Sequence, residues 1–256
     1  MSFQTIEFQT RDGIATLTLN RPAVMNALNS QMRQEITQAL TTLDASVRCV
    51  VLTGAGRGFC SGQDLTDRAA AADLEGTLRD EYEPMLRAIT QCPVPVIAAV
   101  NGTAAGAGAN LALAADVVIA TQGASFIQAF TRIGLIPDAG GTWIIPRSVG
   151  AARAMGMMLF AEPISADQAQ EWGMIWQSVP DDRFADVVAS RARTLADGPT
   201  AAYLAVRQAV AASAGNDLDA QLALEASLQG QAGRSADFVE GVTAFLEKRR
   251  PSFTGR

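Results

Sequence analysis

Two glycine-rich segments are the parts of this chain whose residue types and spacing could do chemistry together. Gly54–Gly62 and Gly102–Gly108 each follow an apolar run that predicts a buried strand. Backbone N–H groups in a strand-to-helix loop of this kind are available to bind an anion. Two such loops that meet can direct their N–H groups at one oxygen, and each donor of this oxyanion hole stabilises developing charge by roughly 3–4 kcal/mol. The two segments together therefore predict a site for an enolate, such as that of a thioester.

Each segment taken alone has other interpretations. Gly54-Ala55-Gly56 lacks the third glycine of the dinucleotide-binding fingerprint, and neither segment ends in the Gly-Lys-Ser/Thr of a P-loop. A nucleotide site is therefore the less favoured alternative. The more favoured alternative is that each segment is a tight turn that binds no ligand.

Asp138 is a candidate for proton transfer. It follows Pro137 in an apolar stretch and precedes Gly140-Gly141. Apolar surroundings disfavour the ionised carboxylate and raise its pKa, which suits a group that both takes and returns a proton. An aspartate at this point could equally cap the N-terminus of the following helix. The residues alone leave both interpretations open.

Composition excludes several classes of chemistry. The chain has no histidine, which rules out Ser-His-Asp triads, Cys-His pairs and histidine-ligated metals, and Lys248 is its single lysine. The formal net charge is −6 and no basic stripe is present, so we expect no nucleic-acid partner.

The cellular setting is indicated by the cysteines and by the N-terminus. Cys49, Cys60 and Cys92 form an odd, sparse set that indicates a reducing compartment. The N-terminus has no basic segment followed by an apolar one, and the most apolar stretch is interrupted by Asn101 and Asp116, so we expect neither a signal peptide nor a membrane span. These observations predict a cytoplasmic protein.

Alternating strands and helices must position these segments. We expect strands at residues 3–9, 14–19, 49–53, 94–100, 116–120 and 175–179, the first two joined by an Asp12-Gly13 turn. We expect helices at 30–45 and 68–91, a loop at 102–108 that opens a helix through 115, and mostly helix from 142 onward. This order predicts an α/β core, residues 1–195, and a helical C-terminal region, residues 196–256.

Five segments, in order along nearly the whole chain, resemble the crotonase or enoyl-CoA hydratase/isomerase family. They are Asn20–Leu28, Leu52–Leu65, Pro95–Gly108, Ile136–Thr142 and Phe245–Arg249. The resemblance implies a spiral of ββα units and C-terminal helices that form a homotrimer, which often pairs into a hexamer. It also implies an acyl-CoA thioester as the substrate, with coenzyme A as part of that substrate, no separate cofactor and no metal.

The resemblance also assigns roles to residues. The N–H groups of Ser61 and Ala107 would form the oxyanion hole. Phe245 and Lys248 of a neighbouring subunit would contact coenzyme A. The adenine end of coenzyme A would lie near Ala23, Met25, Ala27, Gln63, Asp64 and Leu65.

Two positions depart from the hydratases of the family. Those enzymes use two glutamates to activate and position water, and Asn110 and Phe130 stand in their places, where both would line the substrate site. Neither can act as a base. Asp138 stands where isomerases and a dehalogenase of the family carry an aspartate, so it is the expected catalytic acid and base.

Residues 105–114 and 125–143 most resemble the phenylacetate-degrading branch of the family. That branch isomerises 2-(1,2-epoxy-1,2-dihydrophenyl)acetyl-CoA to oxepin-CoA, and we expect this activity here. A Δ3,Δ2-enoyl-CoA isomerase and an enoyl-CoA hydratase of fatty-acid oxidation are the enzymatic alternatives. An acyl-CoA-binding subunit without turnover is the non-enzymatic one.

Overall fold

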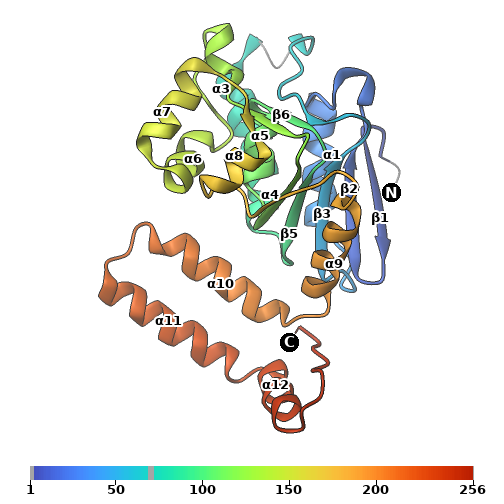
Figure 1. Ribbon diagram of the computed structural model, residues 1–256, viewed down its shortest axis with the longest axis vertical. Coiled ribbons are helices and arrows are strands. Elements are labelled where there is room, and N and C mark those ends of the chain that lie inside the picture. Colours follow the sequence, from blue (N-terminus) through green and yellow to red (C-terminus); the bar gives the residue numbers. More distant parts are fainter. Residues whose placement is uncertain (1–2, 69–71, 256) are drawn as a thin grey trace.

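The larger of two sheets forms the base of the core in this computed structural model, which describes residues 3–68 and 72–255 (Figure 1). Its six strands lie in the order β1-β2-β3-β5-β7-β10. β1 (Ile6–Arg11) and β2 (Ile14–Leu19) are antiparallel, and the predicted turn residues between them, Asp12 and Gly13, have φ angles of 51° and 77°. The parallel strands that follow are β3 (Cys49–Gly54), β5 (Val96–Val100), β7 (Val117–Thr121) and β10 (Gln177–Val179).

A second sheet contains four short strands. They are β4 (Gly58–Cys60), β6 (Thr103–Ala105), β8 (Ser125–Ile127) and β9 (Ile164–Ser165), in the order β4-β6-β8-β9. The first three each follow a strand of the larger sheet and precede helical structure, which confirms the α/β class and the spiral of ββα units. The expected loop at 102–108 contains the strand β6, and the stretch from 142 is mostly helical as expected but also contains the strand β9. Strands of two and three residues are too short to show a period-two pattern.

Helices cover the larger sheet on both faces. α9 (Phe184–Ala196) packs on one face, where Cys49 and Val51 of β3 contact it in a cluster with Val188. The alternate residues Val50 and Leu52 face the main core, so the whole strand is apolar as in other doubly covered parallel sheets.

The main core lies between the two sheets and the remaining helices. The helices are α1 (Ser30–Thr41), α3 (Leu74–Thr77), α4 (Glu83–Thr90), α5 (Ala107–Leu113), α6 (Gly141–Val149), α7 (Ala151–Phe160) and α8 (Ala166–Glu171). Two 3-10 segments, η1 (Pro22–Val24) and η3 (Ala129–Ile133), and the π-helical turn η2 (Leu78–Tyr82) complete them. The helix expected at 68–91 is thus three consecutive pieces, and its residues 69–71 lie outside the described residues.

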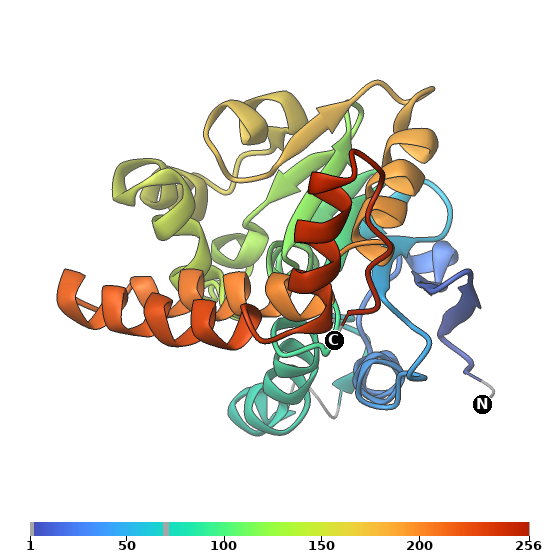
Figure 2. The ribbon, with the colours of Figure 1, turned by 90° about the horizontal axis from the view of Figure 1, so that it is seen from below.

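Three helices form an arm that projects below the core (Figures 1 and 2). They are α10 (Thr200–Ser213), α11 (Leu218–Ala232) and α12 (Ala236–Leu246). Arg207 fastens α10 to the core through Asp116 and the carbonyl oxygens of Cys92 and Val94. In the described part of the chain, no helix is both long and apolar enough to span a membrane.

Candidate active site

The two glycine-rich segments meet where β4 and β6 end side by side. A Cβ built on Gly62 would lie 2.8 Å from the Ala105 carbonyl oxygen and 3.3 Å from the Ala107 nitrogen. A Cβ built on Gly108 would lie 2.5 Å from the Cys60 carbonyl oxygen. Only glycine permits these approaches, since protein Cβ atoms do not come within 3.0 Å of backbone atoms. The segments therefore bring residues 60–62 against residues 105–108.

The N–H groups of Ser61 and Ala107, the two expected oxyanion donors, differ in the hydrogen bonds that they make within the protein. Ala107 is the first residue of α5, so its N–H has no acceptor within that helix. The Ser61 N–H donates to the Met25 carbonyl oxygen at 2.9 Å. A substrate oxygen bound at Ser61 would take the place of the Met25 carbonyl. Met25 is held in a left-handed conformation, with a φ angle of 54°.

Asp138 lies at the wall of a pocket of about 290 Å³. Burial raises the pKa of its carboxyl group to about 6, and its Oδ1 atom is buried with no hydrogen-bond partner among the described residues. The N-cap of α6 is Gly140, and no side chain caps that helix, so the capping interpretation of Asp138 is wrong. The pocket is lined by Leu78, Tyr82, Glu83, Leu86, Arg87, Thr90, Asp138, Ala139 and Gly140.

Asn110 and Phe130 both lie close to Gly106, since the Asn110 N–H donates to the Gly106 carbonyl. The Asn110 side chain is fully buried, and its Nδ2 donates to the Asp138 carbonyl oxygen at 2.8 Å. Phe130 is also buried, and its ring would lie 3.8 Å from a Cβ on Gly106. Asn110, which we expected to face substrate, thus contacts the main chain of the candidate catalytic residue.

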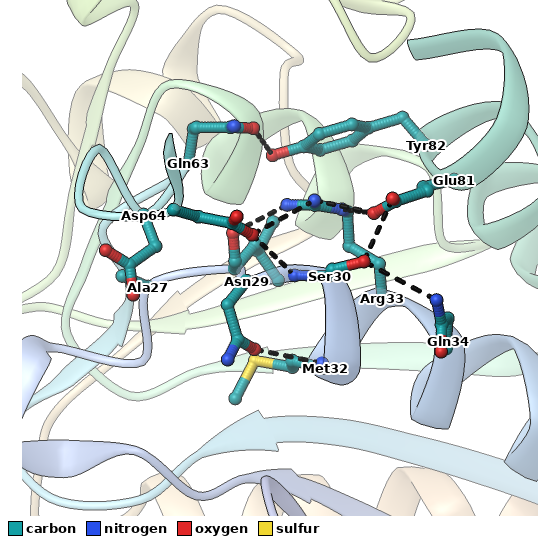
Figure 3. A network of polar contacts seen from close by, with 12 residues as sticks. Ala27, Asn29, Ser30, Met32, Arg33, Gln34, Gln63, Asp64, Glu81 and Tyr82 are labelled. Atoms are coloured by element: carbon teal, nitrogen blue, oxygen red, sulfur yellow. Dashed lines mark hydrogen bonds and ion pairs between the residues drawn. The ribbon is translucent and has the colours of Figure 1, made fainter. Parts of the chain in front are cut away.

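A polar network that the sequence did not predict extends from Tyr82, which lines the pocket, to Arg33 and Glu81 (Figure 3). The Tyr82 hydroxyl donates to Gln63 Oε1 at 2.6 Å, and its ring lies 4.8 Å from the Arg33 guanidinium. Burial raises the pKa of Tyr82. Arg33 is itself fully buried and pairs with Glu81 at 2.6 Å. The one available signal was an arginine on the apolar face of α1, in helical register with Ile36.

Glu83 and Arg87 are further pocket residues that sequence reasoning missed. They form an ion pair across one turn of α4, with half or more of each side chain exposed. They lie at the solvent side of the pocket, whereas Asp138 lies at its buried wall.

The segments expected to hold one end of coenzyme A lie side by side. The Leu28 N–H donates to the Gly62 carbonyl at 2.8 Å, and the Asp64 N–H donates to the Leu28 carbonyl at 3.0 Å. Ala27 and Asp64 are buried, and Asp64 pairs with Arg21 at 2.8 Å. Ala23 and Leu65 are exposed, Met25 and Gln63 partly so.

Phe245 and Lys248 lie at the end of α12, at the far end of the molecule's long axis from α3 and β6 (Figure 1). Phe245 is 82% exposed, and Lys248 has a left-handed backbone with a φ angle of 54°. A single chain therefore does not bring these two residues to the pocket of Asp138.

No group of three or more His, Cys, Asp or Glu side chains within residues 3–68 and 72–255 is placed to hold a metal ion.

Comparison with known proteins gives one consistent result. Residues 9–256 match the family model described as enoyl-CoA hydratase/isomerase. A probable enoyl-CoA hydratase of Rhodobacter capsulatus is 63% identical over the full length of both chains. The 1,2-epoxyphenylacetyl-CoA isomerase of Escherichia coli is 51% identical over 95% of this chain and 96% of its own. The crystal structure of a putative enoyl-CoA hydratase/isomerase from Mycobacterium abscessus, 41% identical, superposes with a TM-score of 0.92 over 98% of this chain and 100% of the other.

Proposed function

The chain belongs to the enoyl-CoA hydratase/isomerase family, and we propose that within this family of enzymes it is an acyl-CoA isomerase that moves protons with Asp138. The observation that carries the proposal is the carboxyl group of Asp138 at the wall of an apolar pocket, with its pKa raised to about 6 by burial. A carboxyl group with this pKa accepts a proton readily near neutral pH and also returns it readily.

The residues around Asp138 favour isomerisation over hydration. Addition of water needs a base that activates the water molecule, and the positions of the family's two glutamates hold Asn110 and Phe130. Neither side chain accepts a proton, and the Asn110 amide already contacts the Asp138 main chain. Isomerisation needs one group that takes a proton and gives it back, which Asp138 supplies alone.

In the proposed reaction the thioester carbonyl oxygen accepts hydrogen bonds from the N–H groups of Ser61 and Ala107. The Ser61 N–H leaves the Met25 carbonyl to do so. Charge held on the carbonyl oxygen makes the α-carbon more acidic, because the enolate is the stabilised form. The Asp138 carboxylate takes the α-proton of a 3-enoyl-CoA and returns it to the γ-carbon, which moves the double bond without net gain or loss of atoms.

We propose 2-(1,2-epoxy-1,2-dihydrophenyl)acetyl-CoA as the substrate and oxepin-CoA as the product. The support is the 51% identity with the E. coli 1,2-epoxyphenylacetyl-CoA isomerase and an acyl pocket walled by Leu78, Leu86 and the Tyr82 ring. With this substrate, the Asp138 carboxyl group would assist opening of the strained epoxide before the ring expands.

Other substrates give the competing functions. A Δ3,Δ2-enoyl-CoA isomerase would use the same aspartate and the same oxyanion donors. An enoyl-CoA hydratase is favoured by the name of the R. capsulatus relative, although it would need acids other than Asn110 and Phe130. A chain that only binds acyl-CoA would show no turnover.

Coenzyme A would reach the site as part of the substrate, with no separate cofactor. We propose that its nucleotide end lies against the 21–28 and 63–65 segments, and that Phe245 and Lys248 of a neighbouring subunit complete the site. The far position of α12 in a single chain supports a contribution from another subunit (Figure 1). The arm after residue 196 would then mediate assembly.

A turnover screen by liquid chromatography coupled to mass spectrometry tests the proposal, because retention time separates isomeric esters of equal mass and the mass reveals added water. The purified protein is incubated with epoxyphenylacetyl-CoA, a 3-enoyl-CoA and a 2-enoyl-CoA, in buffer with a chelator and without added cofactor. The proposal predicts oxepin-CoA from the first ester and, at most, slow hydration of the third. Hydration at the speed of a dedicated hydratase, with no isomerised product, would contradict it.

A further inference from the structure

The position of Asp138 is set through its main chain and not through its carboxyl group. Its carbonyl oxygen accepts two hydrogen bonds, from the Gly141 N–H at 2.9 Å and from Asn110 Nδ2 at 2.8 Å. Its carboxyl Oδ1 has no hydrogen-bond partner among the described residues. Contacts that hold the main chain at Asp138 therefore hold the point from which its carboxyl group projects.

Gln128 holds the other end of the Asn110 amide. The Asp138 carbonyl oxygen can only accept a hydrogen bond, so it fixes Asn110 with Nδ2 toward Asp138 and Oδ1 away from it. Gln128 Nε2 donates to that Oδ1 at 2.9 Å, and the Gln128 and Asn110 side chains are 1% and 0% exposed. The Asn110 side chain is thus held at both ends of its amide, by Asp138 and by Gln128.

The segment held by this bond has little freedom and some strain. Ala139 has a φ angle of 47°, a left-handed conformation that costs a residue with a Cβ on the order of 1–2 kcal/mol. Such a conformation persists only where neighbouring contacts enforce it. Gly141 provides the close fit, because a Cβ there would lie 2.4 Å from Asn110 Nδ2. Asn110 is therefore in direct contact with both ends of the turn that carries the Asp138 carboxyl group.

We propose that Asn110 and Gln128 are positioning residues for Asp138: Gln128 anchors the Asn110 side chain through its Oδ1, and Asn110 holds the Asp138 main chain so that the carboxyl group faces the acyl pocket. The inference rests on the proposed function, in which Asp138 transfers the proton. It gives Asn110 a role other than substrate contact, and it identifies Gln128 as a further residue of the site.

The charged groups near Asp138 make the inference measurable. Tyr82, Glu83 and Arg87, from η2 and α4, are the titratable side chains that line the pocket with it. Tyr82 is protonated near neutral pH because burial raises its pKa, and Glu83 is paired with Arg87. Asn110 and Gln128 carry no charge. Uncharged substitutions there alter the pH profile only by changing how Asp138 is held and hydrated.

Asn110→Ala is the primary variant, with turnover of the best ester from the substrate screen as the readout. Displacement of a catalytic group by about 1 Å costs on the order of 100-fold in rate. We therefore expect kcat to fall about 10- to 100-fold, with KM changed less than about three-fold. The acid limb of the pH–rate profile should also move to lower pH, because a looser Asp138 becomes more hydrated and its pKa falls toward that of an ordinary aspartate.

Gln128→Met removes the hydrogen bond to Asn110 Oδ1 and keeps the size of the side chain. It should produce the same changes, smaller in extent. The double variant should be no slower than Asn110→Ala, because both substitutions act through one contact. Thr5→Ala, which removes a buried hydrogen bond to Glu35 of α1, is the matched control and should leave kcat and the pH profile unchanged.

Two outcomes would overturn the inference. One is a folded Asn110→Ala protein whose kcat stays within two-fold of wild type and whose pH profile is unmoved. The other is a double variant whose losses multiply. If Asn110→Ala does not fold, the kcat and the pH profile of Gln128→Met are compared with wild type instead, and unchanged values overturn the inference. Asp138→Asn separates this inference from the proposed function: if that variant is active, the proposed function fails, and if it is inactive while Asn110→Ala is wild-type, only the positioning role fails.

Discussion

Gly108 and Cys60 approach so closely that a Cβ on the glycine would lie 2.5 Å from the cysteine carbonyl oxygen. This contact joins the start of α5 to the end of β4. It therefore determines how far the Ala107 N–H lies from the Ser61 N–H. An oxyanion hole built from two separate loops works only if both donors reach the same oxygen.

Gly108→Ala should consequently separate the two loops. We expect kcat to fall by about 100-fold, which is what loss of one oxyanion donor costs, together with a lower thermal midpoint. Gly156→Ala is the matched control, because a Cβ on this glycine inside α7 meets nothing within 4 Å. The control should raise stability by roughly 0.5–1 kcal/mol and leave kcat unchanged. Equal behaviour of the two alanine variants in turnover and thermal unfolding would contradict this account of the loops.

Lys248→Ala should weaken binding of the acyl-CoA. Lys248 follows the end of α12 with a left-handed backbone, and its neighbour Arg249 is engaged with Glu240 at 2.6 Å. Loss of a charge-assisted contact to a phosphate should raise the dissociation constant roughly ten-fold in low salt. The loss should shrink as salt screens the charge.

Arg250→Ala removes a neighbouring positive charge and serves as the control in the same calorimetric titrations. It should bind nearly as wild type does. Equal affinities of the Lys248→Ala and Arg250→Ala variants for the acyl-CoA would contradict this role and show that Lys248 is an ordinary solvated residue at a helix end.

The arm should be an assembly surface. Phe238 and Val242 of α12 are 54% and 43% exposed, and Leu222 of α11 is 52% exposed, so an unpartnered chain would present a large apolar face. We expect light scattering to give a trimer or a multiple of it. Phe238→Asp should shift the protein toward smaller species. A clean monomer of the wild-type protein at micromolar concentration would contradict the assembly and, with it, a coenzyme A site shared between subunits.

The stability of the protein should depend on pH through Asp138. Burial raises the pKa of this carboxyl group to about 6 in the folded protein, above its ordinary value of 3.8. The folded state therefore binds the proton more tightly than the unfolded state, so stability falls as the pH rises through the window from about 4 to 6. Asp138→Asn removes this effect and should raise the thermal midpoint at pH 7–8. The difference from wild type should disappear below about pH 4. A variant less stable than wild type at pH 8 would contradict the buried, unpartnered carboxyl group.

Some of these features could be predicted from the sequence. Val96–Val100 can be recognised as a strand because all its residues are apolar. The run is continuous because both faces of this strand are buried. The burial of Asp138 follows from its apolar neighbours, and its raised pKa was expected for that reason.

Other features depend on contacts that no local pattern reveals. Thr103-Ala104-Ala105 forms β6 only because β4 and β8 lie on either side of it. Gln128 reaches Asn110 across 18 positions, and Asn110 reaches Asp138 across 28. From the sequence, Asn110 is expected to contact substrate because it stands in the place of a glutamate of the hydratases. The fold instead directs its amide to the main chain of another residue.

The turnover of Asp138→Asn measures the central claim most directly. Asparagine keeps the shape and the hydrogen-bonding capacity of the side chain and removes its ability to take a proton. The variant should turn over the best ester of the substrate screen at least about 100-fold more slowly than wild type. Its affinity for the same ester, measured by calorimetry, should stay within about three-fold, since the proposed contacts to the thioester come from backbone N–H groups. A folded Asp138→Asn protein with near-wild-type turnover would contradict the assignment of Asp138 as the proton-transferring group.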